Sequence, residues 1–237
     1  MVKGKRIVVL GGSAGIGRAV AEQAAQEGAR VVVVSSNPAR VAAAAREVPG
    51  AEGHAVDLRV EPEVRAFFDR LGAIDHLVYT AGEELMLAPL DGLDLAKARA
   101  FLELRFWGAL SAVKAARPHL ARDGSIVLTS GTAGLRPHAG FVIGASICAA
   151  MEAVTRTLAV ELAPIRVNIV TPGFVDTDLW SNLPEAARSK MFADAAAKLP
   201  VGRIGRAADV AEHYLGFMRG GYVTGQSLVV DGGGVLV

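Results

Sequence analysis

The stretch Leu10-Gly11-Gly12-Ser13-Ala14-Gly15-Ile16-Gly17-Arg18-Ala19 decides the fold. It follows a short apolar run at residues 7–10 and opens a stretch of helical length at 16–27. Glycines in this pattern permit a tight turn and close approach of a pyrophosphate, while free amides at the start of the helix favour an anion. The motif predicts a dinucleotide-binding turn, with Gly11, Ser13, Gly15, Ile16 and Gly17 as contacts.

The same alternation continues on the C-terminal side of this turn. Strand-like runs are continuous rather than alternating in polarity, as is typical of parallel strands covered on both faces. They lie at residues 7–10, 31–34, 54–57, 75–80, 125–129, 165–171 and 227–230, and helical stretches lie at 16–27, 39–47, 62–71, 95–120, 145–162 and 207–218. This order predicts an α/β fold: one Rossmann-like domain, residues 1–237, with a doubly wound parallel sheet and helices on both faces.

The segment 172–206 is the part of the chain that lacks this alternation. In open α/β sheets, ligands bind beyond the carboxyl ends of the strands. Because the segment follows a late strand, we expect it to form a lid over a substrate.

Composition narrows the class of protein. With 237 residues, 51% hydrophobic and 21% charged, the chain can bury a sizeable core. A net charge of +1 argues against a nucleic-acid partner. The single cysteine, Cys148, fits a reducing compartment, and no uninterrupted apolar run approaches about 18 residues, so we expect a cytoplasmic protein without a membrane span. The five histidines are scattered, which predicts no metal site.

The end of the second predicted strand bears on the choice of cofactor. A Rossmann fingerprint has an acid there that holds the 2'-hydroxyl of an NAD ribose, whereas no acid precedes Glu47 in this chain. The missing carboxylate favours NADP(H) over NAD(H), because the side chains present can donate to a 2'-phosphate. Alternatively, residues 36–38 simply cap the next helix, and both interpretations can hold together. The side chains in question are Ser35, Ser36, Asn37 and Arg40.

With the glycine turn placed, the whole chain resembles the short-chain dehydrogenase/reductase family. The landmarks occur in the family's order along nearly the full length. They are the turn at 11–17, Asp57-Leu58, Ala81-Gly82, Gly134, the segment 158–168, Pro172-Gly173, Asp209-Val210-Ala211 and the glycines of 225–233.

The resemblance implies a nicotinamide dinucleotide, a small-molecule substrate and a homo-oligomer, often a tetramer built through two long helices and the C-terminal strand. Asp57 and Leu58 correspond to the adenine contacts, and Ala81 with Gly82 to the wall under the ribose. The segment containing Pro172, Gly173, Val175 and Thr177 corresponds to the nicotinamide carboxamide contacts. The family's Asn-Asn-Ala-Gly is Tyr79-Thr80-Ala81-Gly82 here, so two amides that brace the sheet are missing.

The catalytic positions depart further from the family, whose members use Asn, Ser, Tyr and Lys. An ungapped alignment of the helix through 149–153 places Gly144 at the Tyr position, Cys148 at the Lys position, Gly131 at the Ser position and Arg105 at the Asn position. A shift of one residue restores Ser130 but puts Ile143 and Ile147 at the Tyr and Lys positions. Neither register supplies a tyrosine or a lysine.

Four residues remain as substitutes. Arg105 can stabilise an oxyanion or bind a substrate anion but cannot give up a proton; alternatively it forms an internal ion pair or lies at the surface. Cys148 can titrate, or be an inert small hydrophobe. Ser130 can orient a substrate, or only form a turn, and His138 is a possible acid. The stripe Ile147, Met151, Val154, Leu158 and Leu162 is interpreted as core or subunit interface.

Two hypotheses follow. The first is an NADP(H)-dependent oxidoreductase with an atypical proton path, or with a substrate that needs none, such as an iminium or an activated alkene. The second is a non-catalytic protein, either a dinucleotide-binding sensor or a structural subunit that pairs with an active homologue. The cofactor half of the family pattern motivates the first, and loss of the whole proton-transfer set motivates the second.

Overall fold

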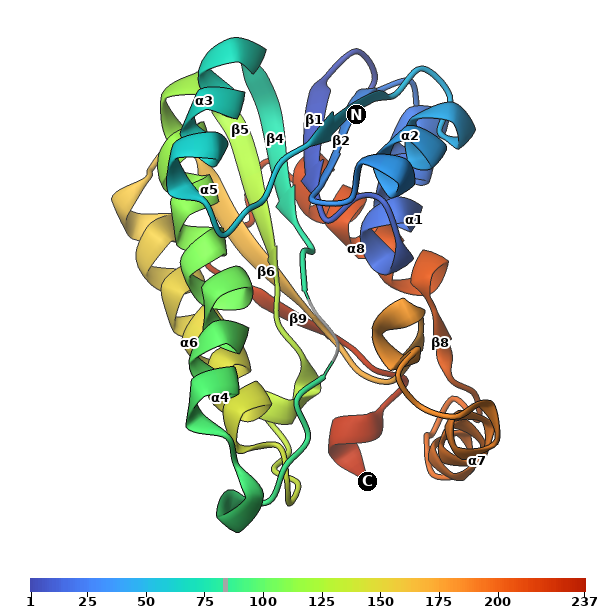
Figure 1. Cartoon of the computed structure of the whole chain (residues 1–237). Helices are drawn as coiled ribbons and strands as arrows, with labels where there is room; N and C mark the ends of the chain where they lie inside the picture. Colours follow the sequence, from blue (N-terminus) through green and yellow to red (C-terminus); the bar gives the residue numbers. More distant parts are fainter. Residues whose placement is uncertain (83–84) are drawn as a thin grey trace.

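The computed structural model describes residues 1–82 and 85–237. Within these residues a seven-stranded parallel sheet has the order β3-β2-β1-β4-β5-β6-β9 (Figure 1). The single doubly wound Rossmann-like domain is therefore confirmed. The strand β3 lies two residues earlier than predicted, and β5 begins at Leu120, five residues before its predicted start. The strands are β1 (Arg6–Leu10), β2 (Arg30–Ser35), β3 (Glu52–Ala55), β4 (Ile74–Tyr79), β5 (Leu120–Thr129), β6 (Arg166–Pro172) and β9 (Ser227–Val230).

The continuous apolar runs arise because the sheet is covered on both faces. In β1, Val8 and Leu10 belong to one core cluster, whereas Ile7 and Val9 belong to the other. All four side chains are fully buried. Successive side chains of a strand point to opposite faces, so a strand between two helix layers needs apolar residues at every position.

Two layers of helices enclose the sheet (Figure 1). The helices α1 and α8 pack on each other on one face, and α3 and α5 pack on each other on the other face. The first layer contains α1 (Gly15–Gln26), α2 (Pro38–Glu47) and α8 (Ala207–Arg219), and the second contains α3 (Glu61–Leu71), α4 (Leu95–Leu102), α5 (Ala109–Ala116) and α6 (Val142–Glu161).

Two of the predicted helical stretches differ from the structure by more than a residue at an end. The stretch 95–120 is not one α-helix, because a π-helical segment, Glu103–Gly108, separates α4 from α5. The helix α6 begins at Val142, three residues before the predicted start, so Gly144 lies in its first turn. The predicted stripe on α6 is core: Ile147, Met151 and Leu162 are buried, and the other two members pack against them.

By length and composition alone, α6 is a candidate membrane span, with a mean hydropathy of 1.3 over its most apolar 18-residue window. A count of uninterrupted apolar runs missed it, because polar residues such as Glu152 and Thr155 interrupt the helix. A core helix of a water-soluble protein meets the same criterion. One face of α6 packs on the sheet through Ile147 and Met151.

The strand order reverses between β1 and β4, which makes the carboxyl ends of these two strands the place where an open α/β sheet binds ligands. The segment 172–206 reaches out beyond this end (Figure 1). It contains β7 (Val175–Asp176), a 3-10 turn at Asp178–Trp180, α7 (Glu185–Ala196) and β8 (Gly205–Arg206). The two short strands pair with each other in parallel, Val175 with Gly205 and Asp176 with Arg206.

Candidate functional site

Every candidate residue lines one continuous cavity at the carboxyl ends of the strands. Its volume of about 1430 Å³ exceeds the roughly 300–1,000 Å³ of an ordinary small-molecule site. The cavity therefore has room for a dinucleotide beside a second small molecule. Residues from the segments that follow β1, β2, β3, β4, β5 and β6 meet there.

The glycine turn packs closely against the backbone at the end of β4. Gly11 has a φ of +87°, and a Cβ on it would lie 2.5 Å from the backbone nitrogen of Ala81. A Cβ on Gly17 would overlap the Thr80 hydroxyl and the Gly11 carbonyl. No side chain caps the start of α1, and its first turn carries no acid. The amides of this helix start can therefore receive an anion, and the narrow glycine cradle fits the pyrophosphate of a dinucleotide.

The segment after β2 forms the next part of the wall. The Asn37 side chain accepts a hydrogen bond from the Arg40 amide at 3.0 Å, with Pro38 in the first turn of α2. The capping interpretation is confirmed. The amide group of Asn37 keeps two donors beyond this bond, and Ser35, Ser36 and Arg40 line the same wall.

Beside this wall, Asp57 is held by a residue that the sequence analysis did not single out. The carboxylate of Asp57 accepts hydrogen bonds from the amide, Nε and Nη2 of Arg59 at 3.0, 2.9 and 2.8 Å. These bonds hold the pKa of Asp57 below its usual value. Arg59 and Leu58 line the cavity as well, so this end of the cavity carries a neutralised acid.

The two family amides are absent at Tyr79 and Thr80, and the side chains present make other hydrogen bonds. Thr80 donates its hydroxyl to the Leu10 carbonyl at 3.0 Å and so ties β4 to β1. Tyr79 donates its phenol to the Leu104 carbonyl at 2.5 Å and so ties β4 to the π-helical segment. Hydroxyl groups therefore make hydrogen bonds at the two positions where the family has amides. Ala81 and Gly82 follow and line the cavity.

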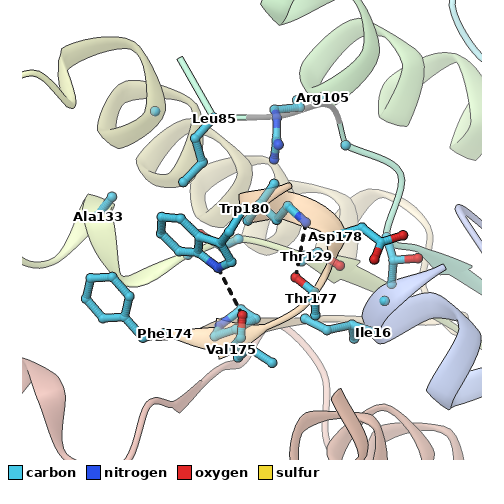
Figure 2. A pocket seen from close by; sticks show the side chains of 18 of the residues that line it. Ile16, Leu85, Arg105, Thr129, Ala133, Phe174, Val175, Thr177, Asp178 and Trp180 are labelled. Atoms are coloured by element: carbon cyan, nitrogen blue, oxygen red, sulfur yellow. Dashed lines mark hydrogen bonds between the residues drawn. The ribbon is translucent and has the colours of Figure 1, made fainter. Parts of the chain in front are cut away.

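Arg105 is partly buried and lines the cavity. Its guanidinium carbon is 4.7 Å from the ring centroid of Phe101. A Cβ on Gly82 would lie 2.9 Å from three atoms of the guanidinium, so the glycine lets the arginine lie against the loop after β4. Figure 2 shows this side chain entering the pocket from the helical layer, across from Trp180 and Thr177.

The positions aligned with the family's other catalytic residues are Gly131, Gly144 and Cys148, which supply neither a phenol nor an ammonium group. Among residues 1–82 and 85–237, nothing lies within 4 Å of a Cβ placed on Gly144, whereas a Cβ on Gly131 would lie 3.2 Å from the Cys148 sulfur. Ser130 donates its hydroxyl to the Cys148 carbonyl at 3.1 Å. Burial raises the pKa of the Cys148 thiol, so the group is a thiol at neutral pH. His138 lines the cavity against Phe141, with ring centroids 5.7 Å apart.

The opposite wall is aromatic. Phe174 and Trp180 stack with centroids 5.5 Å apart and an interplanar angle of 18°. The indole nitrogen of Trp180 donates to the Val175 carbonyl at 3.0 Å, which fixes the ring over the cavity (Figure 2). Thr177 accepts a hydrogen bond from the Leu179 amide at 3.4 Å. Pro172 and Gly173 complete the lining at the end of β6.

Sequence signals for the missed residues existed. Arg59 directly follows the predicted adenine pair. Phe174 and Trp180 are aromatic residues in a chain with only 5% aromatic content, inside the predicted lid. Among the residues that the structure describes, no three of the types His, Cys, Asp or Glu lie close enough together to hold a metal ion.

Comparisons with known proteins agree with this geometry. The family described as enoyl-(acyl carrier protein) reductase matches residues 11–234. The short-chain dehydrogenase/reductase ATR9 of Stachybotrys chlorohalonatus is 39% identical over 99% of this chain and 98% of that protein. A small-chain dehydrogenase solved in complex with NADPH is 36% identical, with a TM-score of 0.88 over 98% of this chain and 99% of that one. The reductase/Diels-Alderase MalC of Malbranchea aurantiaca is 28% identical, with a TM-score of 0.92 over 100% of this chain and 98% of that one.

Proposed function

The chain belongs to the short-chain dehydrogenase/reductase family, and from this premise we propose that it is an NADP(H)-dependent reductase of an electron-poor double bond in a small apolar molecule. One observation carries the proposal: the glycine cradle and the Arg105 guanidinium line the same cavity. The first fits a dinucleotide, and the second fits a substrate that acquires negative charge.

The proposed dinucleotide contacts follow the cavity wall in order. The glycine turn and the start of α1 hold the pyrophosphate, the segment after β2 holds the 2'-phosphate, and the loops after β3, β4 and β6 hold the adenine, ribose and nicotinamide. These groups are Gly11, Ser13, Gly15, Ile16 and Gly17; Ser35, Ser36, Asn37 and Arg40; Asp57 and Leu58; Ala81 and Gly82; and Pro172, Gly173, Val175 and Thr177.

The preference for NADP(H) is supported by charge. The wall after β2 presents hydroxyls, an amide and the Arg40 guanidinium, and the nearest following acid in the sequence, Glu47, is paired with Arg18. Arginine and hydroxyl donors suit a phosphate. The similar dehydrogenase solved with NADPH agrees with this assignment.

Bound NADPH would supply a hydride to the substrate. When a conjugated alkene accepts a hydride at its β-carbon, the electron pair moves to the carbonyl oxygen, where Arg105 would stabilise the charge. No side chain at Gly144 donates a proton, so water would protonate the product. An iminium gains no negative charge on reduction, and Arg105 would repel its cation. The guanidinium therefore favours the activated alkene, the reaction class that the matching family's description also names.

In this proposal Arg105, Gly131, Gly144 and Cys148 stand where relatives keep their catalytic tetrad, and Ser130 orients the substrate. The raised pKa of Cys148 argues against a thiolate role. The segment 172–206 forms the lid, with Trp180 facing the cavity. No observation favours a non-catalytic subunit.

We also propose a cytoplasmic homo-oligomer, a dimer or tetramer. Val160 on α6 is 81% exposed and Trp107 is 54% exposed, which leaves apolar surface beside the long helices. Size-exclusion chromatography with light scattering measures the oligomeric state, and a monomer at every concentration would contradict this part of the proposal.

The main test has two stages. Calorimetric titration with NADPH and NADH is expected to give tighter binding of NADPH. The loss of NADPH absorbance is then followed with 2-cyclohexenone, a cyclic iminium and cyclohexanone, and turnover is expected to be fastest with the enone. Absence of binding by either dinucleotide would overturn the premise, and faster turnover of the saturated ketone would overturn the proposed chemistry.

A further inference from the structure

The helix that carries Arg105 is irregular at the arginine itself. Residues Glu103–Gly108 form a π-helical turn between two α-helical segments. Such turns are rare in proteins, and those that occur are often at functional sites. A side chain that interacts with a carbonyl inside a helix is a recognised cause of departure from the regular α-helical ladder.

The phenol of Tyr79 makes this interaction. Tyr79 lies on β4, is 2% exposed, and donates to the carbonyl of Leu104, the residue directly before Arg105. The approach requires Gly108, because a Cβ there would lie 2.8 Å from the phenol oxygen. One hydroxyl thus connects the sheet to the helical turn from which Arg105 extends.

The sheet end of this connection is fixed. The Tyr79 carbonyl accepts the Thr129 hydroxyl at 2.6 Å, and that hydroxyl lies 2.6 Å from the phenol oxygen of Tyr214 on α8. Tyr214 and Tyr79 are both buried. Because β4, β5 and α8 share these bonds, the Tyr79 backbone is held at a fixed position from which its phenol sets the position of the turn.

We propose that Tyr79 is a positioning residue that holds Arg105 in the substrate half of the cavity through the Leu104 carbonyl. The inference rests on the proposed role of Arg105 as the group that stabilises an oxyanion. Tyr79 touches neither substrate nor cofactor in this proposal. The guanidinium lies over the Phe101 ring and next to Gly82, where the lack of a Cβ leaves room for it. The π turn brings the side chain to this position.

The test uses 4-nitrophenol as an enolate mimic. An oxyanion site binds its phenolate form in preference to the phenol, which visible absorption reports at a pH below the solution pKa of the probe. Tyr79→Phe is expected to lower the bound phenolate-to-phenol ratio by roughly tenfold, as for one weakened charge-assisted hydrogen bond. In an Arg105→Met background, Tyr79→Phe is expected to change nothing further, since the two residues act in series.

Two further variants separate positioning from general stability. Gly108→Ala places a methyl group against the phenol while favouring an ordinary helix, so it should lower the ratio as Tyr79→Phe does. Thr155→Val removes another buried hydroxyl, one that donates to the Met151 carbonyl within α6 at 2.8 Å, and is the control. Thermal unfolding of each variant checks that the fold is retained.

The outcomes distinguish a failure of the positioning role of Tyr79 from a failure of the proposed oxyanion role of Arg105. If Arg105→Met lowers the ratio but Tyr79→Phe and Gly108→Ala do not, the positioning role is overturned and the role of Arg105 stands. Equal losses from Tyr79→Phe with and without Arg105 would also overturn the positioning role. If 4-nitrophenol does not bind, or Arg105→Met has no effect on its spectrum, the oxyanion site fails and the inference fails with it.

Discussion

In the proposed alignment Arg105 stands where the family keeps its catalytic amide, and a guanidinium there would change what the substrate half of the cavity can stabilise. It is permanently charged and cannot be a general acid at neutral pH. Next to it, position 144 is a glycine and position 148 carries a thiol whose pKa burial raises. Reduction of an ordinary ketone needs a proton donor as the alkoxide forms, whereas a conjugated alkene spreads the charge onto an oxygen that Arg105 can stabilise.

The first prediction at this scale restores the missing groups. The triple variant Gly131→Ser, Gly144→Tyr and Cys148→Lys is expected to raise the rate of cyclohexanone reduction by roughly 100-fold, the usual contribution of a general acid. The changes belong together, because the Cys148 sulfur would crowd a serine Cβ at 131, whereas the space around Gly144 is open.

The matched control carries phenylalanine in place of the new tyrosine and differs by one hydroxyl. Initial rates of NADPH oxidation compare the two variants. If both gain the same rate, the hydroxyl at position 144 is not the proton donor, and the alignment of the catalytic positions is wrong.

The second residue-scale prediction concerns the choice of dinucleotide. Ser36→Asp places a carboxylate in the wall after β2, where the 2'-phosphate is proposed to bind. Repulsion between the two anions is expected to raise the Kd for NADPH by roughly tenfold or more, with a smaller effect in high salt. The Kd for NADH should change little.

Calorimetry measures both constants, and Ser36→Asn is the uncharged control. Equal weakening of NADPH and NADH by the carboxylate would place the 2'-phosphate elsewhere.

At the scale of elements, the lid contributes one ring that the cavity depends on. Trp180 is 6% exposed, stacks on Phe174 and is fixed by its bond to the Val175 carbonyl. Trp180→Ala is expected to raise the KM of an apolar enone by roughly tenfold, since a buried aromatic contact is lost. The turnover number and the Kd for NADPH should change little.

The control is Tyr222→Ala, which removes an aromatic ring that is fully exposed and is not among the residues that line the cavity. Steady-state kinetics gives the comparison. A larger change in NADPH affinity than in KM would assign Trp180 to the dinucleotide and not to the substrate.

The helices and strands also differ in how well the sequence predicts them. Strands such as β1 and β2 were predictable, because burial on both faces demands an unbroken apolar run. The break between α4 and α5 was not, because the phenol that bonds to the Leu104 carbonyl within it comes from β4, far away in the sequence. The early start of α6 was missed because Phe141 at its N-terminus makes no side-chain capping bond that a pattern could reveal.

The same distinction holds for the site. The glycine turn could be located from the sequence because the residues that form it are adjacent in the chain. The strand order then brings the remaining loops to the same edge of the sheet. The pairing of Asp57 with Arg59 and the entry of Arg105 into the cavity depend on side-chain geometry. Residue types alone left the alternatives for Arg105 open.

At the scale of the whole molecule, the sheet contains a pH-sensitive group far from the site chemistry. His76 on β4 is 4% exposed, and its Nδ1 lies 2.9 Å from the Ser125 hydroxyl on β5. Burial is the largest influence and lowers the pKa of His76 to about 4. Asp75 and Asp123 favour the charged form, whereas Arg166 and Lys5 oppose it. The folded protein therefore keeps this imidazole neutral at physiological pH.

The sign of the effect on stability follows from proton binding. The unfolded chain takes up a proton near the ordinary pKa of 6.5, but the folded protein does so only near 4. The unfolded state therefore binds more protons between these values, and stability is fully present above 6.5 and falls as the pH drops toward 4. From about pH 7 to about pH 5, the free energy of unfolding is expected to fall by about 2 kcal/mol from this group alone.

Urea unfolding at the two pH values measures this loss. His76→Gln should reduce the difference to the remainder contributed by other groups, while the same change at His213, which is partly exposed on α8, should leave it intact. A carboxylate that is paired with arginine does not interfere with this comparison of unfolding free energies at the two pH values. Asp209, held by Arg203 and Arg206, has a pKa far below its usual value, and the stability that this provides is lost only as the pH falls toward the ordinary value of 3.8, below the two pH values compared. If His76→Gln leaves the full pH dependence in place, the neutral buried imidazole is not its cause.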